Sequence, residues 1–334
     1  NNAAKIISPE KFYLRMKQLG KAASFERYML SDNMPLFRWI QNEKISNKDI
    51  NDSLRYTIEY GGEKMSPNGM QIMECTKDAY GHTYIPGSSI KGMLRTLLLC
   101  RELEKTGSKD EFKRSVERAC NDAGYRKPNR KEFLSQNAKD IEYAFLRILD
   151  REGVKDKNDA VNDVLSGLVV SDSQPLSISD LVLCQKIDVG TDGHESSLNL
   201  LRECIKPDVA IKCTITIDTT ICPYSIDDIE EAITIGSKMA KDNFFNHFDY
   251  PDDITEKTVW LGGGSGFVQK TLVYTLFPGR EGVEKTKQIF KATDVPEKHK
   301  HNKDSKASPH MMKCTEYDGY LFHFGHCEVS FKEK

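Results

Sequence analysis

The stretch from residue 84 to residue 95 reads Tyr84-Ile85-Pro86-Gly87-Ser88-Ser89-Ile90-Lys91-Gly92-Met93-Leu94-Arg95. Its second half predicts a helix, because apolar side chains recur there at helical spacing. The loop before the helix places two hydroxyls and free backbone N–H groups at a helix N-terminus. The stretch therefore predicts a phosphate-binding helix start formed by Ser88, Ser89, Lys91 and Arg95. A simple helix cap made by the two serines is the alternative interpretation.

Around this helix, strand and helix patterns occur in both halves of the chain. Residues 105–165 are polar and compatible with helices, which indicates a helical insertion. Val209–Thr219 alternates apolar and polar residues and predicts a half-buried strand, and Ser225–His247 predicts a long helix. The Tyr317-Asp318-Gly319 turn near the end predicts a hairpin. The pattern favours an α+β protein with two sheet-based domains and a helical insertion in the first.

Composition excludes several classes of protein. With 334 residues, of which 38% are hydrophobic, the chain can bury a substantial core, which excludes wholesale disorder and a coiled rod. No apolar run approaches the roughly 18 residues that a membrane span requires, and the sequence start does not resemble a signal peptide. The nine cysteines are odd in number and include no C-x-x-C pair, which is typical of reduced thiols. We therefore expect a cytoplasmic protein without a membrane partner.

The charge is unevenly distributed along the chain. The overall balance is −2, but Lys91–Lys131 holds 12 basic against 6 acidic residues, whereas Asp150–Asp253 holds 9 basic against 21 acidic residues. Helix surfaces often carry such imbalances, so two ordinary solvated faces are one interpretation. The other is a subunit that turns one surface toward a polyanion.

A glycine-rich loop, Gly262-Gly263-Gly264-Ser265-Gly266, offers a second candidate site. Consecutive glycines let backbone N–H groups approach a phosphate closely. The loop matches no nucleotide-binding motif, because a Walker loop requires lysine directly after its last glycine and Lys270 lies four residues beyond. We interpret it as a contact with a nucleic-acid backbone, with Lys270 as the neighbouring cation. In that case Gly266→Ala mainly lowers binding, whereas a loop that only requires positive φ would lose stability.

Catalytic and metal-binding patterns are weak. Acid–base cleavage of RNA would require histidines beside a phosphate, and the candidates are His299-Lys300-His301 and His310. They lie in a charged segment that favours a solvated loop or an RNA contact. Asp249, Asp252 and Asp253 are the nearest approach to a metal nuclease and follow a helix in a loop. The sequence therefore predicts no catalytic residue, no metal site and no cofactor.

The quoted helix-opening stretch resembles that of the RAMP proteins, the RNA-binding subunits of CRISPR effector complexes. Leu261–Phe267 is similar to their glycine-rich loop. Three further segments resemble, within this superfamily, the family of the fifth subunit of the type III-A Csm complex: Val170-Ser171-Asp172-Ser173, Arg202-Glu203-Cys204-Ile205-Lys206-Pro207 and Ser308-Pro309-His310-Met311-Met312-Lys313-Cys314-Thr315. The similar segments are scattered from about residue 84 to residue 328.

The resemblance implies two ferredoxin-like, RRM-like domains, which we place at residues 1–205, with the helical insertion at about 105–165, and 206–334, with the glycine-rich loop. It implies a non-catalytic subunit that caps the 3′ part of the guide RNA (crRNA) and supports its maturation in antiviral defence. The implied partners are the guide RNA, the backbone RAMP subunit, the small helical subunit and a host trimming nuclease. The expected RNA contacts are Ser88, Ser89, Lys91, Arg95, Gly262, Gly263, Gly264, Ser265, Gly266, Lys270, His299 and Lys300.

Two other functions remain open at the level of sequence. One is a RAMP-type endoribonuclease that processes precursor guide RNA. The other is an assembly adaptor whose sheets bind only protein.

Overall fold

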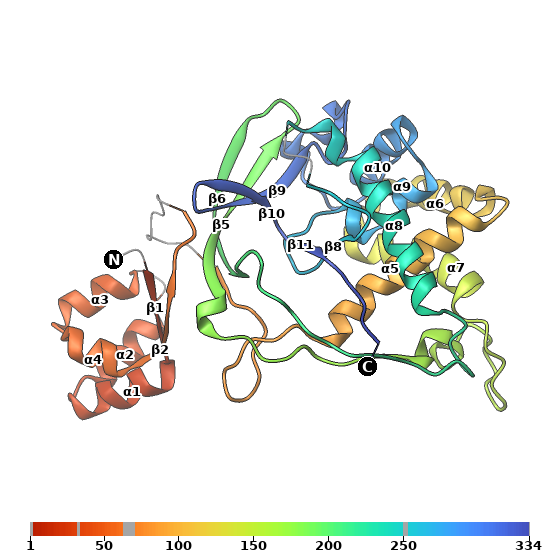
Figure 1. The fold of residues 1–334 in the computed structure, drawn as a ribbon. Helices are drawn as coiled ribbons and strands as arrows, with labels where there is room; N and C mark the ends of the chain where they lie inside the picture. The colour runs from red at the N-terminus through yellow and green to blue at the C-terminus, as the bar shows by residue number, and fades with distance from the viewer. Residues whose placement is uncertain (1–2, 32–33, 63–70, 250–252, 334) are drawn as a thin grey trace.

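The computed structural model describes residues 3–31, 34–62, 71–249 and 253–333 (Figure 1). The helices are α1 (Pro9–Gln18), α2 (Ala22–Met29), α3 (Leu36–Asn42), α4 (Asn47–Asp52), α5 (Gly87–Lys105), α6 (Asp110–Ala123), α7 (Arg130–Phe145), α8 (Ile226–Asn243), α9 (Val273–Leu276) and α10 (Arg280–Ala292). The strands are β1 (Ala3–Ile7), β2 (Leu54–Glu59), β3 (Gln71–Met73), β4 (Leu168–Val170), β5 (Leu181–Gly190), β6 (Glu195–Ile205), β7 (Ile215–Ile217), β8 (Thr258–Trp260), β9 (Met311–Tyr317), β10 (Tyr320–His323) and β11 (His326–Glu328). The predicted α+β class is confirmed.

The largest sheet has the strand order β10-β9-β5-β6-β3, in which β3 runs parallel to β6 and the other neighbours are antiparallel. The long strands β5 and β6 cross the middle of the molecule (Figure 1). The proposed domain boundary after residue 205 coincides with the end of β6, and β9 from the second half pairs with β5 from the first. One sheet therefore joins the two halves of the chain.

Helices α5 and α8 form the centre of the helical side of the molecule. Leu94 and Leu98 of α5 share one buried cluster with Ile229 and Ile233 of α8. The two helices approach closely at Gly236, where a Cβ atom would lie 2.2 Å from the Leu97 side chain. Burial of this apolar stripe drives the packing, as the helical periodicity predicted. Every helix among the described residues is too short or too polar to cross a membrane.

The N-terminal helices α1–α4 form a separate unit together with strands β1 and β2. Its small core contains Phe12, Met16, Phe25, Trp39 and Ile45. In Figure 1 this unit lies at the far side of the β5–β6 hairpin from helices α5–α10. Strand β2 connects it to the main sheet through a shared cluster of Ile58, Leu181, Leu183 and Leu201.

The strand predicted at Val209–Thr219 is much shorter in the structure. Only Ile215–Ile217 forms a strand, which pairs with β4. The preceding residues keep two hydrogen bonds to the chain that follows β4, from the Ser171 N–H to the Thr214 carbonyl and from the Gln174 N–H to the Lys212 carbonyl. The regular alternation of burial that the pattern predicted is lost before β7, where Cys213 is exposed.

Candidate nucleic-acid interface

A cleft of about 1230 Å³ lies between the helical side of the molecule and the main sheet. Its wall on the sheet is set by strand alternation: on β5, Lys186 and Asp188 flank the buried Ile187, and on β9 Lys313 follows the buried Met312. The opposite wall contains the first turn of α7, and the glycine-rich loop and residues 298–301 complete the lining. The cleft thus gathers segments that are far apart in the sequence.

Cations outnumber acids in this cleft, and six of them have no acidic partner within the part of the chain that the structure describes. Among the residues that the structure describes, no carboxylate lies within ion-pair distance of Arg130, Lys131, Arg202, Lys270, Lys298 and Lys300. The acids of the lining are already matched: Asp188 pairs with Lys313 at 2.9 Å, and Glu142 lies 3.7 Å from Arg95. Asp294 accepts a hydrogen bond from the Arg130 backbone N–H at 2.9 Å. The surplus positive charge is therefore available to an external anion.

Burial and, after it, neighbouring like charges lower the pKa values of two lysines in the cleft. Burial and the nearby Lys313 lower the pKa of Lys186. Burial, together with Arg202 and Lys131, lowers the pKa of Lys270. A bound polyanion would relieve this repulsion, because an opposite charge favours the ionised form of each lysine.

Two N–H donors in the cleft lack a hydrogen-bond acceptor. Arg202 Nε and Asn137 Nδ2 are buried, and neither has a partner among the described residues. A buried donor without an acceptor costs about 1–3 kcal/mol, and a ligand oxygen would remove that cost. Both the charges and the unpaired donors thus fit an oxygen-rich anion.

The glycine-rich loop forms one border of the cleft, and its glycines have different roles. Gly262 and Gly266 have φ values of 88° and 104°, which a residue with a side chain rarely adopts. Gly264 packs against Phe324, since a Cβ atom there would lie 2.9 Å from that side chain. A Cβ at Gly263 would instead lie 3.0 Å from Arg202 Nη1. The backbone conformation of Gly266 itself requires glycine, which favours a loss of stability in Gly266→Ala. Close approach of RNA at Gly266 stays a prediction.

Two side chains close this loop from within. Lys270 Nζ donates to the Gly262 carbonyl at 2.7 Å, and Ser265 Oγ donates to the same oxygen at 3.2 Å. Ser265 is buried, whereas Lys270 lies at the exposed border of the cleft. The structure thus brings Lys270 beside the loop, as predicted, and gives it a structural bond there.

The start of α5 lies outside the cleft. Pro86 precedes the helix, neither serine caps it, and Ser88 and Ser89 are exposed while Lys91 is half-buried. The Gly87 N–H donates to the Asp172 carboxylate at 2.8 Å, so the protein's own acid already occupies part of this helix N-terminus. The simple-cap alternative for the serines is wrong. A contact between RNA and this helix start stays a prediction.

Arg95 belongs to the cleft but is already paired. Its guanidinium lies 2.7 Å from Asp163 and 3.7 Å from Glu142. The Asp163 side chain is only 11% exposed, so Arg95 compensates a largely buried charge. The four residues that the sequence grouped at the helix start are thus divided between two surfaces.

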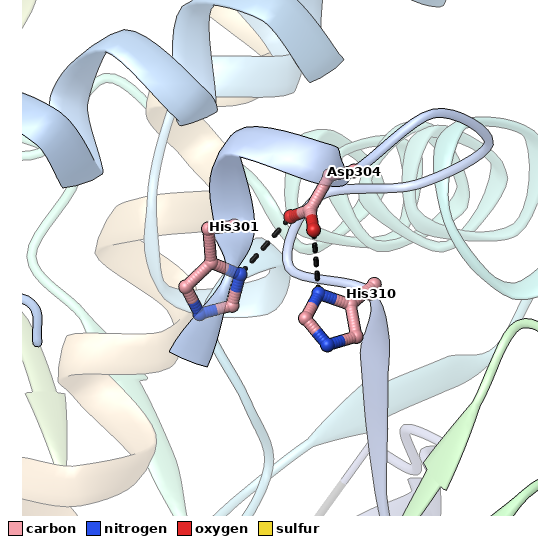
Figure 2. Close-up of side chains that lie close together, drawn as sticks. All are labelled: His301, Asp304 and His310. Carbon is pink, nitrogen blue, oxygen red and sulfur yellow. Dashed lines mark hydrogen bonds and ion pairs between the residues drawn. The ribbon is translucent and has the colours of Figure 1, made fainter. Parts of the chain in front are cut away.

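His299 and Lys300 are exposed and line the cleft near the glycine-rich loop. In the segment that follows them, His301, Asp304 and His310 converge (Figure 2). Of the three acids considered for a metal nuclease, Asp252 lies outside the described residues, and Asp253 Oδ2 lies 3.3 Å from His326 Nδ1. The predicted loop residues and the predicted glycine-rich loop therefore border the same cleft.

Five further cations line the cleft that no sequence motif had indicated: Lys131, Lys186, Arg202, Lys298 and Lys313. Signals were present for some of them: Lys131 ends the cationic stretch, and Arg202 and Lys313 lie in segments with family resemblance. No single segment could show that these side chains face the same cleft, because that depends on the pairing of β5 with β6 and β9.

Comparison with known proteins identifies the family of this chain. The model of the RAMP superfamily matches residues 47–305. The chain belongs to the RAMP superfamily. The resemblance drawn from the helix-opening stretch and the glycine-rich loop is therefore confirmed.

Proteins described as "CRISPR system Cms protein Csm5" are similar over most of the chain. That of Mycobacterium tuberculosis (strain CDC 1551 / Oshkosh) is 25% identical over 343 residues, covering 93% of this chain and 85% of the relative. That of Streptococcus thermophilus is 28% identical over 278 residues, covering 78% of this chain and 69% of the relative. The likeness to this kind of subunit is confirmed at the level of sequence.

Two solved structures share the fold. One is a chain of a cryo-EM structure of a Csm-crRNA-target RNA ternary complex of a type III-A CRISPR-Cas system, with a TM-score of 0.62, 18% identity and coverage of 98% of this chain and 92% of that chain. The other is the crystal structure of T. onnurineus Csm5, with a TM-score of 0.55, 20% identity and coverage of 83% and 85%. At these identities the likeness concerns the fold alone.

Proposed function

We propose that this chain is the Csm5-type, RNA-binding subunit of a type III-A CRISPR ribonucleoprotein. The observation that carries the proposal is the set of six cleft cations without acidic partners among the described residues. A single-stranded RNA supplies a regular row of phosphates, and neutralising them releases counterions, which favours binding. The similarity to proteins named Csm5 supports the choice of RNA as the polyanion.

The RNA backbone runs, in this proposal, along the cleft between α7 and the β5–β6–β9 face. Lys131 and Arg202 approach it from opposite walls, and His299 and Lys300 contact it from the border. The glycine-rich loop presents its backbone beside Gly263, where a side chain would meet Arg202. Phosphate contacts of this kind position the RNA without reading its sequence.

Within the complex the chain caps the 3′ part of the guide RNA and supports its maturation. Its partners are the guide RNA, the backbone RAMP subunit, the small helical subunit and a host nuclease that trims the RNA. The family implication of two ferredoxin-like domains divided near residue 205 belongs to this proposal. Strand β6 ends at Ile205, while β9 and β10 of the second half belong to the same sheet as β5 and β6. The nine free thiols fit a cytoplasmic complex.

The chain acts without cleaving RNA. His301 and His310 both contact the buried carboxylate of Asp304 through Nδ1, and this contact leaves Nε2 of each ring available, so a cleavage assay has to separate binding from catalysis. The test is incubation of the full chain with precursor guide RNA, with and without Mg²⁺. No cleavage is expected. Cleavage that disappears in His299→Ala/His301→Ala/His310→Ala would establish the endoribonuclease alternative instead.

A subunit that only binds protein is distinguished by direct RNA binding. The full chain, without other subunits, is titrated against labelled single-stranded RNA at several salt concentrations. We expect binding that weakens steeply with salt. Absence of binding at low salt would favour the assembly adaptor.

A further inference from the structure

Three potential metal ligands converge in the segment between α10 and β9. Figure 2 shows His301 and His310 on either side of Asp304, with both Nδ1 atoms turned toward its carboxylate. His301 Nδ1 lies 3.0 Å from Asp304 Oδ2, and His310 Nδ1 lies 2.5 Å from Asp304 Oδ1. One ligand atom from each of the three residues falls within 4.8 Å of the others. We propose that His301, Asp304 and His310 form a binding site for a transition-metal ion of the Zn²⁺ type.

The donor set favours a borderline metal over a hard one. Two imidazole nitrogens and one carboxylate oxygen are typical ligands of Zn²⁺, whereas Mg²⁺ and Ca²⁺ prefer sites built from oxygen. Zn–N and Zn–O bonds of about 2.0–2.2 Å place tetrahedral ligands roughly 3.3 Å apart. The N···O separations of 3.0 Å to His301 and 2.5 Å to His310 therefore have to widen by about 0.3 Å and about 0.8 Å around an ion.

The carboxylate is held in place by a surrounding shell. Asp304 is buried, and Ser308 Oγ donates to its Oδ2 at 2.6 Å. Tyr274 fixes Ser308 in turn: its hydroxyl donates to the Ser308 carbonyl at 2.8 Å and accepts from the Ser308 N–H at 3.1 Å. The Phe290 ring packs against His301 at 4.6 Å between ring centroids. Such second-shell contacts orient metal ligands and strengthen binding.

The site opens toward the cleft on one side. His301 and His310 both line the cleft, while Asp304 lies behind them. Three protein ligands leave a fourth position of a tetrahedral ion for water or another oxygen ligand. The metal proposal does not depend on RNA binding, because all three ligands come from this chain.

A hydrogen-bonded triad without metal is the competing explanation. In that case each Nδ1 keeps its proton and donates to Asp304, and the three side chains simply fix the loop. The two explanations differ in what happens on adding Zn²⁺. A metal site replaces both protons by an ion, so binding stabilises the folded chain, whereas the triad gains nothing.

The experiment strips the full chain with a chelator and titrates it with ZnCl₂ by calorimetry. We expect one equivalent to bind, an increase in Tm, and at least a tenfold loss of affinity in His301→Gln and His310→Gln. The control is His299→Gln, an exposed neighbour outside the triad, which should bind as wild type. Absence of Zn²⁺ binding by the wild type, or unchanged affinity in both triad variants, would overturn the proposal.

Cobalt substitution provides a second measurement on the wild-type chain, which decides the matter even if a variant fails to fold. Co²⁺ in this site should give the visible bands of a four-coordinate ion without a thiolate-to-cobalt charge-transfer band. A strong thiolate band would place the metal on cysteines instead and contradict the proposal.

Discussion

Lys270 Nζ lies 2.7 Å from the Gly262 carbonyl oxygen, across the mouth of the glycine-rich loop. The same ammonium group lies at the border of the cleft, where burial, together with Arg202 and Lys131, lowers its pKa. One side chain therefore closes the loop and contributes positive charge to the proposed RNA path.

The variant Lys270→Met tests whether Lys270 contributes charge to RNA binding in addition to stabilising the loop. We expect RNA affinity to fall and the salt slope to decrease by about 0.7, because one phosphate contact on a single strand is lost. A modest decrease in Tm should accompany it, since the loop loses a hydrogen bond worth about 1 kcal/mol. Lys238→Met, on the exposed face of α8, is the matched control. A stability loss with an unchanged salt slope would restrict Lys270 to a structural role.

Two glycines of the loop should respond differently to alanine. Gly266→Ala places a side chain at φ 104°, so the free energy of unfolding should fall by roughly 1 kcal/mol or more. Gly263→Ala meets the flexible end of Arg202, so the fold should persist while Arg202 moves and RNA binding weakens. Thermal melts and RNA titrations of both variants provide the comparison. Equal melting of the two variants would refute this assignment of roles.

The predicted helix-start site can be divided by single substitutions. Arg95→Met leaves Asp163 without its ion-pair partner, so we expect the free energy of unfolding to fall by about 1–3 kcal/mol. Lys91 forms no such ion pair with another described residue, so Lys91→Ala should keep the wild-type Tm. A decrease in RNA affinity in Lys91→Ala would establish a second RNA contact outside the cleft, whereas wild-type affinity would remove it.

Much of the secondary structure could be predicted from local sequence. Ser225 and Asp228 form a capping box at the start of α8, and Asp318-Gly319 forms the predicted turn with φ values of 49° and 79°. These features depend on neighbouring residues only. The cleft could not be predicted in this way, because Lys131 and Arg202 line it together only after the sheet and helices have packed. The metal-site proposal has the same origin: the sequence showed His301 and His310 but not the buried carboxylate between them.

His323 makes stability depend on pH. Burial lowers its pKa to about 3, and its Nδ1 accepts a hydrogen bond from Trp260 Nε1 at 3.3 Å. The folded chain therefore keeps His323 neutral while the unfolded chain protonates it near pH 6.5. Because the unfolded state binds more protons, stability falls as pH decreases from 6.5 toward 3.

The matched variant is His323→Gln, which retains a hydrogen-bond acceptor but does not titrate. Between pH 7 and pH 5 the wild type should lose about 2 kcal/mol more stability than the variant. Urea unfolding at the two pH values measures the difference. Parallel pH dependence of the two proteins would show that His323 is charged in the folded chain or exposed.

The most direct test of the proposed RNA-binding cleft is the salt dependence of RNA binding by Lys131→Gln/Arg202→Gln/Lys298→Gln. These side chains border one cleft, and none forms an ion pair with another described residue. The triple variant Lys17→Gln/Lys48→Gln/Lys238→Gln removes the same charge from exposed helix positions elsewhere and serves as control. We predict at least a tenfold loss of affinity and a salt slope smaller by about 2 in the cleft variant only. Affinity and slope equal to those of the control variant would contradict RNA binding in this cleft.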